Sequence, residues 1–166
     1  MRPKKTGFQP HVGAETHTWL TPRWLLDKLG RFDLDPCGEP GWITADNHYY
    51  ELGLMKPWYG RVWCNPPYGK ETFSWLHKLS EHGDGIALVF ARTDTKWFNA
   101  LKFDAINMIK NRIGFLRPED IQMVNHYVVS SNGNAPSMLI AWGQHNVDAL
   151  HNVPGRVFIE HAKDHS

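Results

Sequence analysis

The chain has 166 residues, of which 42% are hydrophobic and 21% are charged, a composition typical of a globular domain and unlike that of a disordered chain. Eighteen basic side chains nearly balance seventeen acidic ones, so the net charge of +1 selects no class of partner. Two cysteines are too few for a disulfide framework, no apolar run reaches the ~20 residues that span a bilayer, and no signal peptide is visible. We therefore expect one domain over residues 1–166 in a reducing compartment, with residues 1–17 forming a flexible basic arm.

The first predicted elements are a helix and a short strand. Thr21 as N-cap and Pro22 at the first helical position predict a helix that ends at Gly30. Residues 32–35 alternate apolar and acidic side chains, which predicts a short strand. Residues 38–60 are rich in Gly, Pro, Asn and Asp, and their length indicates a functional loop with one turn of helix.

The middle of the chain carries the strongest pattern. Residues 61–64 predict a buried strand, and residues 70–82 an amphipathic helix. Residues 86–91 form a continuous apolar run of the kind found inside parallel sheets. Thr93 or Thr95 is then expected to cap a short helix.

The C-terminal part is less regular. Residues 105–115 predict one or two strands, residues 117–136 a loop, and residues 138–142 a last strand. Strands that alternate with helices indicate an α/β sheet with crossover helices.

Three of the predicted strands end in unusual polar sequences, at residues 35–37, 65–68 and 92–95. In an open α/β sheet, ligands bind outside the carboxyl ends of the strands. If these strands are parallel, their ends meet at one edge, where we expect the functional site.

The loop Asn65-Pro66-Pro67-Tyr68 has a specific chemistry. Two consecutive prolines fix two backbone angles and remove two N–H donors, which leaves a rim of acceptors: the Asn65 side-chain oxygen and the backbone carbonyls. Such a rim suits a planar group that bears an NH2. The exocyclic amine of adenine is a poor nucleophile, and the Asn65 oxygen and Pro66 carbonyl can hold its two N–H bonds while positive charge develops on the nitrogen. Tyr68 can stack on the base.

The chain resembles the small DNA N6-adenine methyltransferases of phages and prophages, the phage Dam-type family with the Asn-Pro-Pro-Tyr motif. The matching segments are residues 19–22, 32–37, 62–69, 91–98, 113–115 and 135–137. The resemblance implies a reduced class I methyltransferase fold, which is Rossmann-like and depends on S-adenosylmethionine. It also implies methylation of N6 of adenine in double-stranded DNA, after base flipping, in the cytoplasm of a bacterial host. The glycine-rich loop of larger relatives is missing, and residues 35–37 stand in its place.

The cofactor side is predicted from charge and from the resemblance. S-adenosylmethionine is a net cation, and residues 27–51 hold six acidic side chains against two basic ones. Asp35 is our candidate for the methionine ammonium, and either Asp46 or Glu51 could bind the ribose. The cofactor-binding residues that we expect are Thr21, Pro22, Asp35, Pro36, Cys37 and Asn65.

The DNA side is predicted from the basic half of the chain. Residues 92–117 hold six basic side chains against two acidic ones, which suits contacts to phosphates. The DNA-binding residues that we expect are Arg92, Lys96, Lys110 and Arg112. None of the ten histidines has zinc-finger spacing, so no metal site is predicted.

Two other functions fit parts of the sequence. Asn-Pro-Pro-Tyr also serves the methylation of glutamine side chains in proteins, because a carboxamide NH2 is an equally weak nucleophile. A catalytically silent nucleic-acid-binding module is the other alternative, and the intact motif argues against it. The recognition sequence and the oligomeric state stay open.

Overall fold

A computed structural model describes residues 19–117 and 135–161. The predicted arm over residues 1–17 and most of the predicted loop over residues 117–136 lie outside the described residues. The helices and strands, in chain order, are α1 (Arg23–Leu29), β1 (Leu34–Asp35), β2 (Asn47–His48), the 3₁₀ turn η1 (Gly53–Met55), β3 (Val62–Cys64), α2 (Thr72–His82), β4 (Gly85–Phe90), α3 (Lys96–Ala100), β5 (Ala105–Ile109), β6 (Ser137–Trp142), α4 (Gln144–Leu150) and β7 (Gly155–Ile159).

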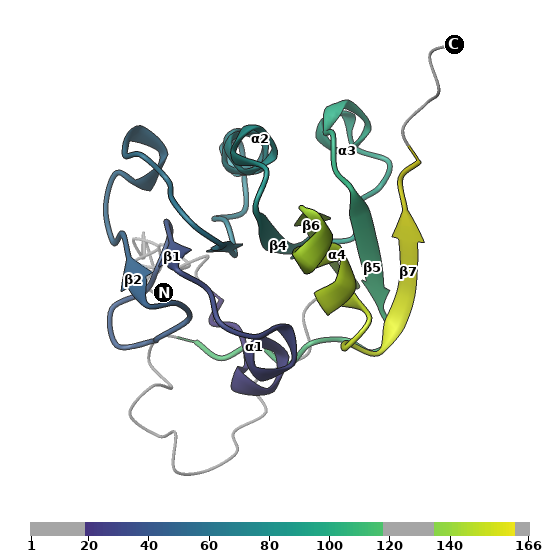
Figure 1. The fold of residues 1–166 in the computed structure, drawn as a ribbon, viewed down its shortest axis with the longest axis horizontal. Coiled ribbons are helices and arrows are strands. Elements are labelled where there is room, and N and C mark those ends of the chain that lie inside the picture. Colours follow the sequence, from purple (N-terminus) through teal and green to yellow (C-terminus); the bar gives the residue numbers. More distant parts are fainter. Residues whose placement is uncertain (1–18, 118–134, 162–166) are drawn as a thin grey trace, which may run out of the picture.

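The strands form one seven-stranded sheet in the order β2-β1-β3-β4-β6-β5-β7 (Figure 1). β1 is parallel to β2 and β3, and β3 is parallel to β4. β6 lies antiparallel between β4 and β5, and β7 lies antiparallel to β5. The carboxyl ends of β1, β3, β4 and β5 therefore open on the same edge, which confirms the predicted convergence of strand ends.

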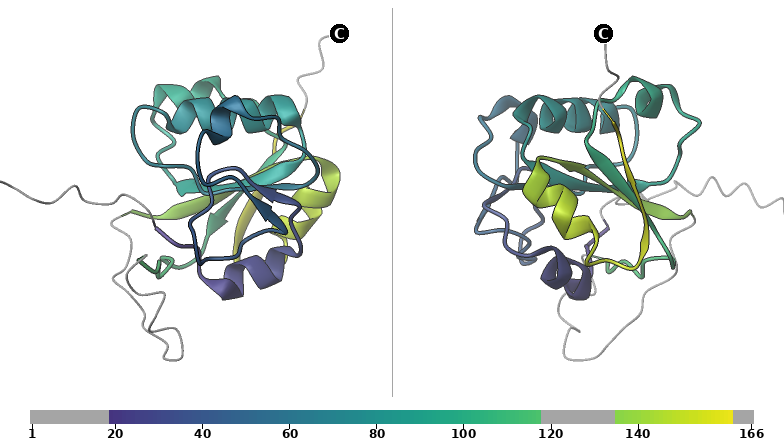
Figure 2. Two further views of the ribbon diagram at one scale, coloured as in Figure 1. Left: turned by 90° about the vertical axis from the view of Figure 1, so that its left-hand side faces the viewer. Right: turned by 45° about the vertical axis from the view of Figure 1, so that its right-hand side comes forward.

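Helices cover both faces of the sheet, as the alternation of strands and helices predicts (Figure 2). α1 and α4 pack on one face, whereas α2 and α3 pack on the other. β4 shows how the sequence builds both cores. Ile86 and Leu88 enter the core under α1 and α4, and Ala87 and Val89 alternate with them into the core under α2.

The helix termini are partly as predicted. Gly30 ends α1 with a positive φ of 88°, and the Thr95 side chain caps α3. Thr21 does not cap α1: the N-cap is Pro22, with no capping side chain. Thr21 is instead buried, and its hydroxyl lies 3.4 Å from the Asn65 amide nitrogen. This contact, distant in sequence, takes the hydroxyl away from the helix.

The expectation that residues 138–142 are the last strand is wrong, because α4 and β7 follow β6. β6 itself is buried along its whole length, as its apolar sequence predicts. β7 is an edge strand with mostly exposed side chains, so it lacks the burial pattern that sequence analysis depends on. The long loop over residues 38–60 contains the expected helical turn, η1, and also the short strand β2.

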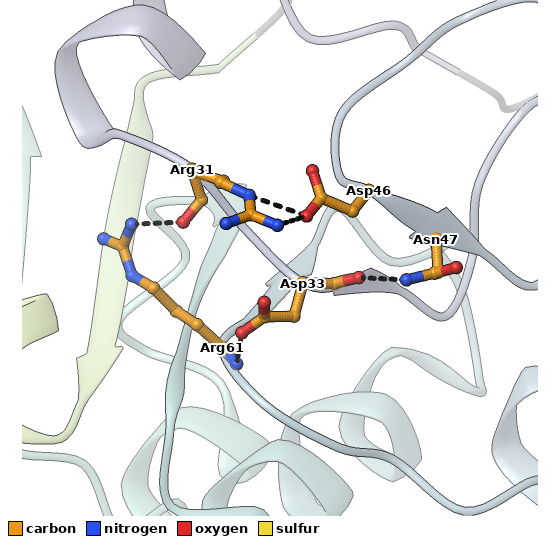
Figure 3. A network of polar contacts seen from close by, with 5 residues as sticks. All are labelled: Arg31, Asp33, Asp46, Asn47 and Arg61. Carbon is orange, nitrogen blue, oxygen red and sulfur yellow. Dashed lines mark hydrogen bonds and ion pairs between the residues drawn. The ribbon is translucent and has the colours of Figure 1, made fainter.

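A buried guanidinium joins α1, α4 and the sheet. Arg61 donates from Nε to Asn146 Oδ1 at 2.6 Å and from its two terminal nitrogens to the carbonyls of Leu29 and Arg31, each at 2.8 Å. Figure 3 shows the Arg31 side of this network, with the exposed pair that Arg31 forms with Asp46. Burial lowers the pKa of Arg61, and the three acceptors compensate for the lost water. Arg61 thereby fixes the C-terminal end of α1 against the sheet.

Candidate active site

A cleft of about 510 Å³ opens at the carboxyl ends of β1 and β3. This volume lies within the usual range of ~300–1,000 Å³ for small-molecule sites. Among the predicted cofactor-binding residues, five line the cleft: Thr21, Asp35, Pro36, Cys37 and Asn65. Pro22 does not line it. The cleft therefore brings together residues that are distant in the sequence, such as Thr21 and Asn65, which are 44 residues apart.

The orientation of Asn65 is fixed by the segment before α1. The Asn65 side-chain nitrogen donates to the carbonyl of Trp19 at 2.6 Å and lies 3.4 Å from the Thr21 hydroxyl. Within the described part of the chain, no hydrogen bond engages the Asn65 side-chain oxygen. This oxygen is thus left as an acceptor in the cleft, beside the buried Pro66. Sequence analysis missed Trp19 as the residue that orients the amide, because a backbone carbonyl leaves no signal in the side-chain pattern.

Asp35 is buried in the cleft wall and is held by two donors. One carboxylate oxygen accepts from the backbone N–H of Cys37 at 2.9 Å, and the other accepts from the Thr44 hydroxyl. Burial raises the pKa of Asp35, while the hydrogen bonds from Thr44 and Cys37 oppose the rise. Asp33, two residues earlier, accepts from the backbone N–H of Arg61 outside the cleft. The two acids therefore have different surroundings, although they are only two residues apart; Asp33 lies just before β1 begins.

Thr44 connects Asp35 to a histidine that sequence analysis did not assign. His48 Nε2 accepts the backbone N–H of Thr44 at 3.1 Å, so this nitrogen carries no proton, and the Thr44 hydroxyl lies 3.2 Å from it. The His48 ring stacks on Tyr50, with ring centroids 5.8 Å apart. Loop 38–60 thus supplies a second layer of contacts behind Asp35.

The cleft is lined by acids. Besides Asp35, its described lining contains Glu39, Glu51 and Glu71, and it contains no lysine or arginine. A cleft with this lining attracts cationic ligands. Of the two ribose candidates, only Glu51 lines the cleft, because Asp46 pairs with Arg31 elsewhere on the surface.

The outer wall of the cleft is the apolar turn η1 with the residue before it, within the loop where the sequence predicts one turn of helix. Leu52 and Met55 line the cleft and are 67% and 81% exposed, and Leu52 has a positive φ of 54°. Lys78 on α2 donates to the carbonyls of Leu54 and Lys56 at 2.7 and 2.6 Å. A Cβ on Gly53 would come within 1.8 Å of the Pro36 carbonyl, so only glycine allows this close approach. These contacts hold the turn in a fixed position as the outer wall of the cleft.

Cys37 and Cys64 connect the ends of β1 and β3. Their sulfur atoms are 3.9 Å apart, and the Cys37 thiol donates to the backbone carbonyl of Asn65 at 3.3 Å. The contact with Cys64 and burial raise the pKa of Cys37 well above its ordinary value. Cys37 is therefore a neutral thiol that packs between the two strand ends.

Tyr68 lies beside the cleft and does not line it. Its ring stacks on Phe90 at the end of β4, with centroids 4.4 Å apart and planes 18° apart. The Tyr68 hydroxyl is buried without a hydrogen-bond partner in the described part of the chain, and burial raises its pKa. One face of the ring is thus occupied by Phe90, whose other neighbours include the Arg92 guanidinium, 5.9 Å from the Phe90 ring centroid.

The four predicted DNA-binding residues are exposed, and none of them lines the cleft. Arg92 follows the end of β4 and Lys110 follows the end of β5. The pairing of Phe90 with Ser137 and of Met108 with Met138 places both ends at the edge where Asn65 follows β3. Lys96 begins α3, and Arg112 follows Lys110. The sheet thus presents acids on one part of this edge and basic side chains on the other.

Three comparisons with known proteins were made, and one of them gave a match. Neither the search of curated proteins nor the search of solved structures gave a match. No helix in the described ranges is both long and apolar enough to cross a membrane. A family model described as DNA N-6-adenine-methyltransferase (Dam) matches residues 11–156, which include the cleft, the Asn-Pro-Pro-Tyr loop and most of the sheet. This match favours DNA over protein glutamine as the substrate. The chain belongs to the Dam family of DNA N-6-adenine-methyltransferases.

Proposed function

We propose that the chain transfers a methyl group from S-adenosylmethionine to N6 of an adenine that has been flipped out of duplex DNA. The observation that carries the proposal is the orientation of Asn65, whose NH2 is held by Trp19 while its oxygen is left as an acceptor in an acidic cleft. Family membership supports adenine in DNA as the substrate.

The residues of the cleft fit the cofactor. S-adenosylmethionine supplies an electrophilic methyl group on a sulfonium and carries an ammonium and a ribose. The acidic lining suits this net cation, and the absence of lysine and arginine from the described lining removes repulsion. Asp35 would bind the ammonium, Glu51 the ribose hydroxyls, and Thr21, Pro36 and Cys37 would form the walls.

The acceptors at the end of β3 would activate the amine. The Asn65 side-chain oxygen and the Pro66 carbonyl accept the two N–H bonds of N6, which favours a tetrahedral nitrogen with an available lone pair. The same acceptors stabilise the positive charge that develops on the nitrogen during attack. No base is needed before attack, because the proton leaves after the nitrogen becomes cationic. Pro67 keeps the loop rigid.

Base flipping would use the groups beside the cleft. Extruding a base costs a few kcal/mol, and stacking on an aromatic ring returns ~1–3 kcal/mol. Phe90 covers one face of Tyr68, so the base would stack on the opposite face. Arg92, next to this stack, would contact a phosphate of the flipped strand.

The test is Asn65→Ala. We expect methyl transfer to fall by roughly 10²–10³-fold, the effect of removing one oriented donor or acceptor from a transition state, while cofactor affinity stays within a few-fold. Radioactive methyl transfer to DNA and calorimetry with S-adenosylmethionine measure the two quantities, and digestion to nucleosides identifies the product.

Asn47→Ala is the matched control, because Asn47 is an exposed amide that contacts the Asp33 carbonyl away from the cleft. It should leave both quantities unchanged. Near-normal turnover in Asn65→Ala would remove Asn65 from the mechanism, and methylated glutamine in place of N6-methyladenine would refute the substrate.

A further inference from the structure

The two edges of the sheet differ strongly. β2, at one edge, has only two residues, and short edge strands resist pairing with other chains. β7 lies at the other edge (Figure 1). It has five residues and exposes Phe158 and Ile159, each by 53%. Within the described residues, no strand pairs with the outer side of β7. An unpaired edge strand with exposed apolar side chains is a template for pairing with another strand.

The hydrogen bonds with β5 show which backbone groups of β7 are available. The N–H of Glu160 donates to Asp104 at 2.9 Å, and Pro154 accepts from Lys110 at 3.0 Å. In an antiparallel ladder, residues alternate between those that bond to the neighbouring strand and those that point away from it. Because Pro154 and Glu160 bond inward, the backbone groups of Val157 and Ile159 point outward.

The sequence of β7 is complementary to itself. In an antiparallel pairing centred on Phe158, Val157 of one chain lies opposite Ile159 of the other, which matches the outward-pointing backbone groups. The same register places the two Phe158 side chains opposite each other. It also places Arg156 opposite Glu160 twice, and both side chains are exposed in the single chain. Opposite charges and apolar groups in these positions stabilise a strand pair.

We propose that two copies of this chain associate through β7, which joins their sheets into one antiparallel-paired sheet across a two-fold axis. The axis reverses the strand direction between copies, so the two clefts open on opposite edges of the joined sheet. Each chain keeps its own complete site. The association therefore does not depend on the proposed function, and the failure of one is distinguishable from the failure of the other.

Charge reversal tests the register. We expect full-length protein to show a monomer–dimer equilibrium in sedimentation velocity at several concentrations. Arg156→Glu and Glu160→Arg should each raise the dimer dissociation constant at least about tenfold, because each makes two attractive cross-strand pairs repulsive. The double variant R156E/E160R restores opposite charges at both positions and should bring the constant back to within a few-fold of the original.

Three further measurements complete the test. Glu81→Lys, a charge reversal on the exposed surface of α2, should not change association. Val157→Pro removes an outward N–H and should weaken association while circular dichroism shows an intact fold. Methyl transfer per chain should be unchanged in all these variants. Protein that stays monomeric at every concentration, or a dimer that is weakened equally by both single variants and the double variant, would overturn the proposal.

Discussion

Asp35 is a buried carboxylic acid in the cleft wall, and its burial lowers the stability of the fold when it is charged. Because burial raises its pKa above 3.8, the folded protein binds the proton more tightly than the unfolded chain does. The free energy of unfolding contributed by Asp35 therefore rises as the pH falls through the raised pKa towards the ordinary value. At neutral pH the charged carboxylate lowers the stability of the fold, and a bound ammonium would offset this loss.

Asp35→Asn should consequently separate stability from binding. An asparagine can still accept from the Cys37 N–H and donate to the Thr44 hydroxyl, whose proton can then face His48. We expect a higher free energy of unfolding than wild type at neutral pH, with the difference shrinking as the pH falls. Affinity for S-adenosylmethionine should fall at least about tenfold, since a charge pair is lost. Urea unfolding across pH and calorimetry measure both, and unchanged cofactor affinity would make Asp35 a structural residue.

Tyr68 allows a similar separation between its ring and its hydroxyl. The hydroxyl is buried without a partner in the described part of the chain, and burial raises its pKa further above the neutral range. We expect Tyr68→Phe to retain most of the activity and to gain about 1 kcal/mol of stability, because an unpaired polar group is removed. Tyr68→Ala should lose at least about tenfold in turnover at saturating cofactor. Equal losses in turnover would show that the hydroxyl carries the role.

The residues of the site differ in how far sequence can predict them. Asn65, Pro66 and Asp35 are visible because rare residue types follow apolar strands. Trp19, Thr44 and His48 are not visible, because they act through a carbonyl, a hydroxyl and a ring nitrogen brought together only by the folded loops. The position of a residue at a strand end can be seen in the local sequence, whereas these contacts depend on how distant segments fold together.

At the scale of elements, α1 depends on Arg61 for its attachment. The guanidinium satisfies the carbonyls of Leu29 and Arg31 and the Asn146 amide oxygen, all distant in sequence. Arg61→Lys cannot reach three acceptors in this geometry, because an ammonium lacks the planar fork. We expect a loss of about 2–4 kcal/mol in the free energy of unfolding, measured by urea denaturation.

Arg31→Lys is the matched control for this change. Arg31 pairs with Asp46 on the exposed surface, where an ion pair contributes little. It should leave the denaturation midpoint near that of wild type. If both variants lost the same stability, the buried position of Arg61 would not explain its effect.

The elements that sequence predicted best are those with a strong burial pattern, such as α2, β4 and β6. The direction of β6 could not be predicted, because a fully buried strand has the same apolar run in parallel and antiparallel sheets. β7 was missed for the opposite reason, since its exposed side chains carry no periodic signal.

At the scale of the whole molecule, one sheet edge carries an acidic cleft and, further along, basic side chains that follow β4 and β5. If the basic part holds the phosphate backbone, DNA affinity should fall steeply with salt. Arg92→Ala and Lys110→Ala should each weaken binding and flatten the slope of log affinity against log salt by about 0.9, on any DNA sequence. Arg92→Ala should also lower turnover at saturating DNA.

Lys28→Ala provides the charge-matched comparison in the same salt titrations. Lys28 is exposed in the last turn of α1, which precedes β1 and therefore lies away from the edge where the strands end. Its slope should match that of wild type. Slopes that stay unchanged in all three variants would show that the basic edge makes no contact with phosphates.

The place of β6 between β4 and β5 has a consequence for the synthesis of the chain. β5 precedes β6 in the sequence, yet it reaches the sheet only through β6. During synthesis, the side of β4 away from β3 therefore stays unpaired until β6 has emerged from the ribosome. β5 also has no partner strand until then. Non-local pairing of this kind is slow and leaves apolar strands open to aggregation. The core around β4 and β5 can therefore form only after residues 137–142 have been synthesised.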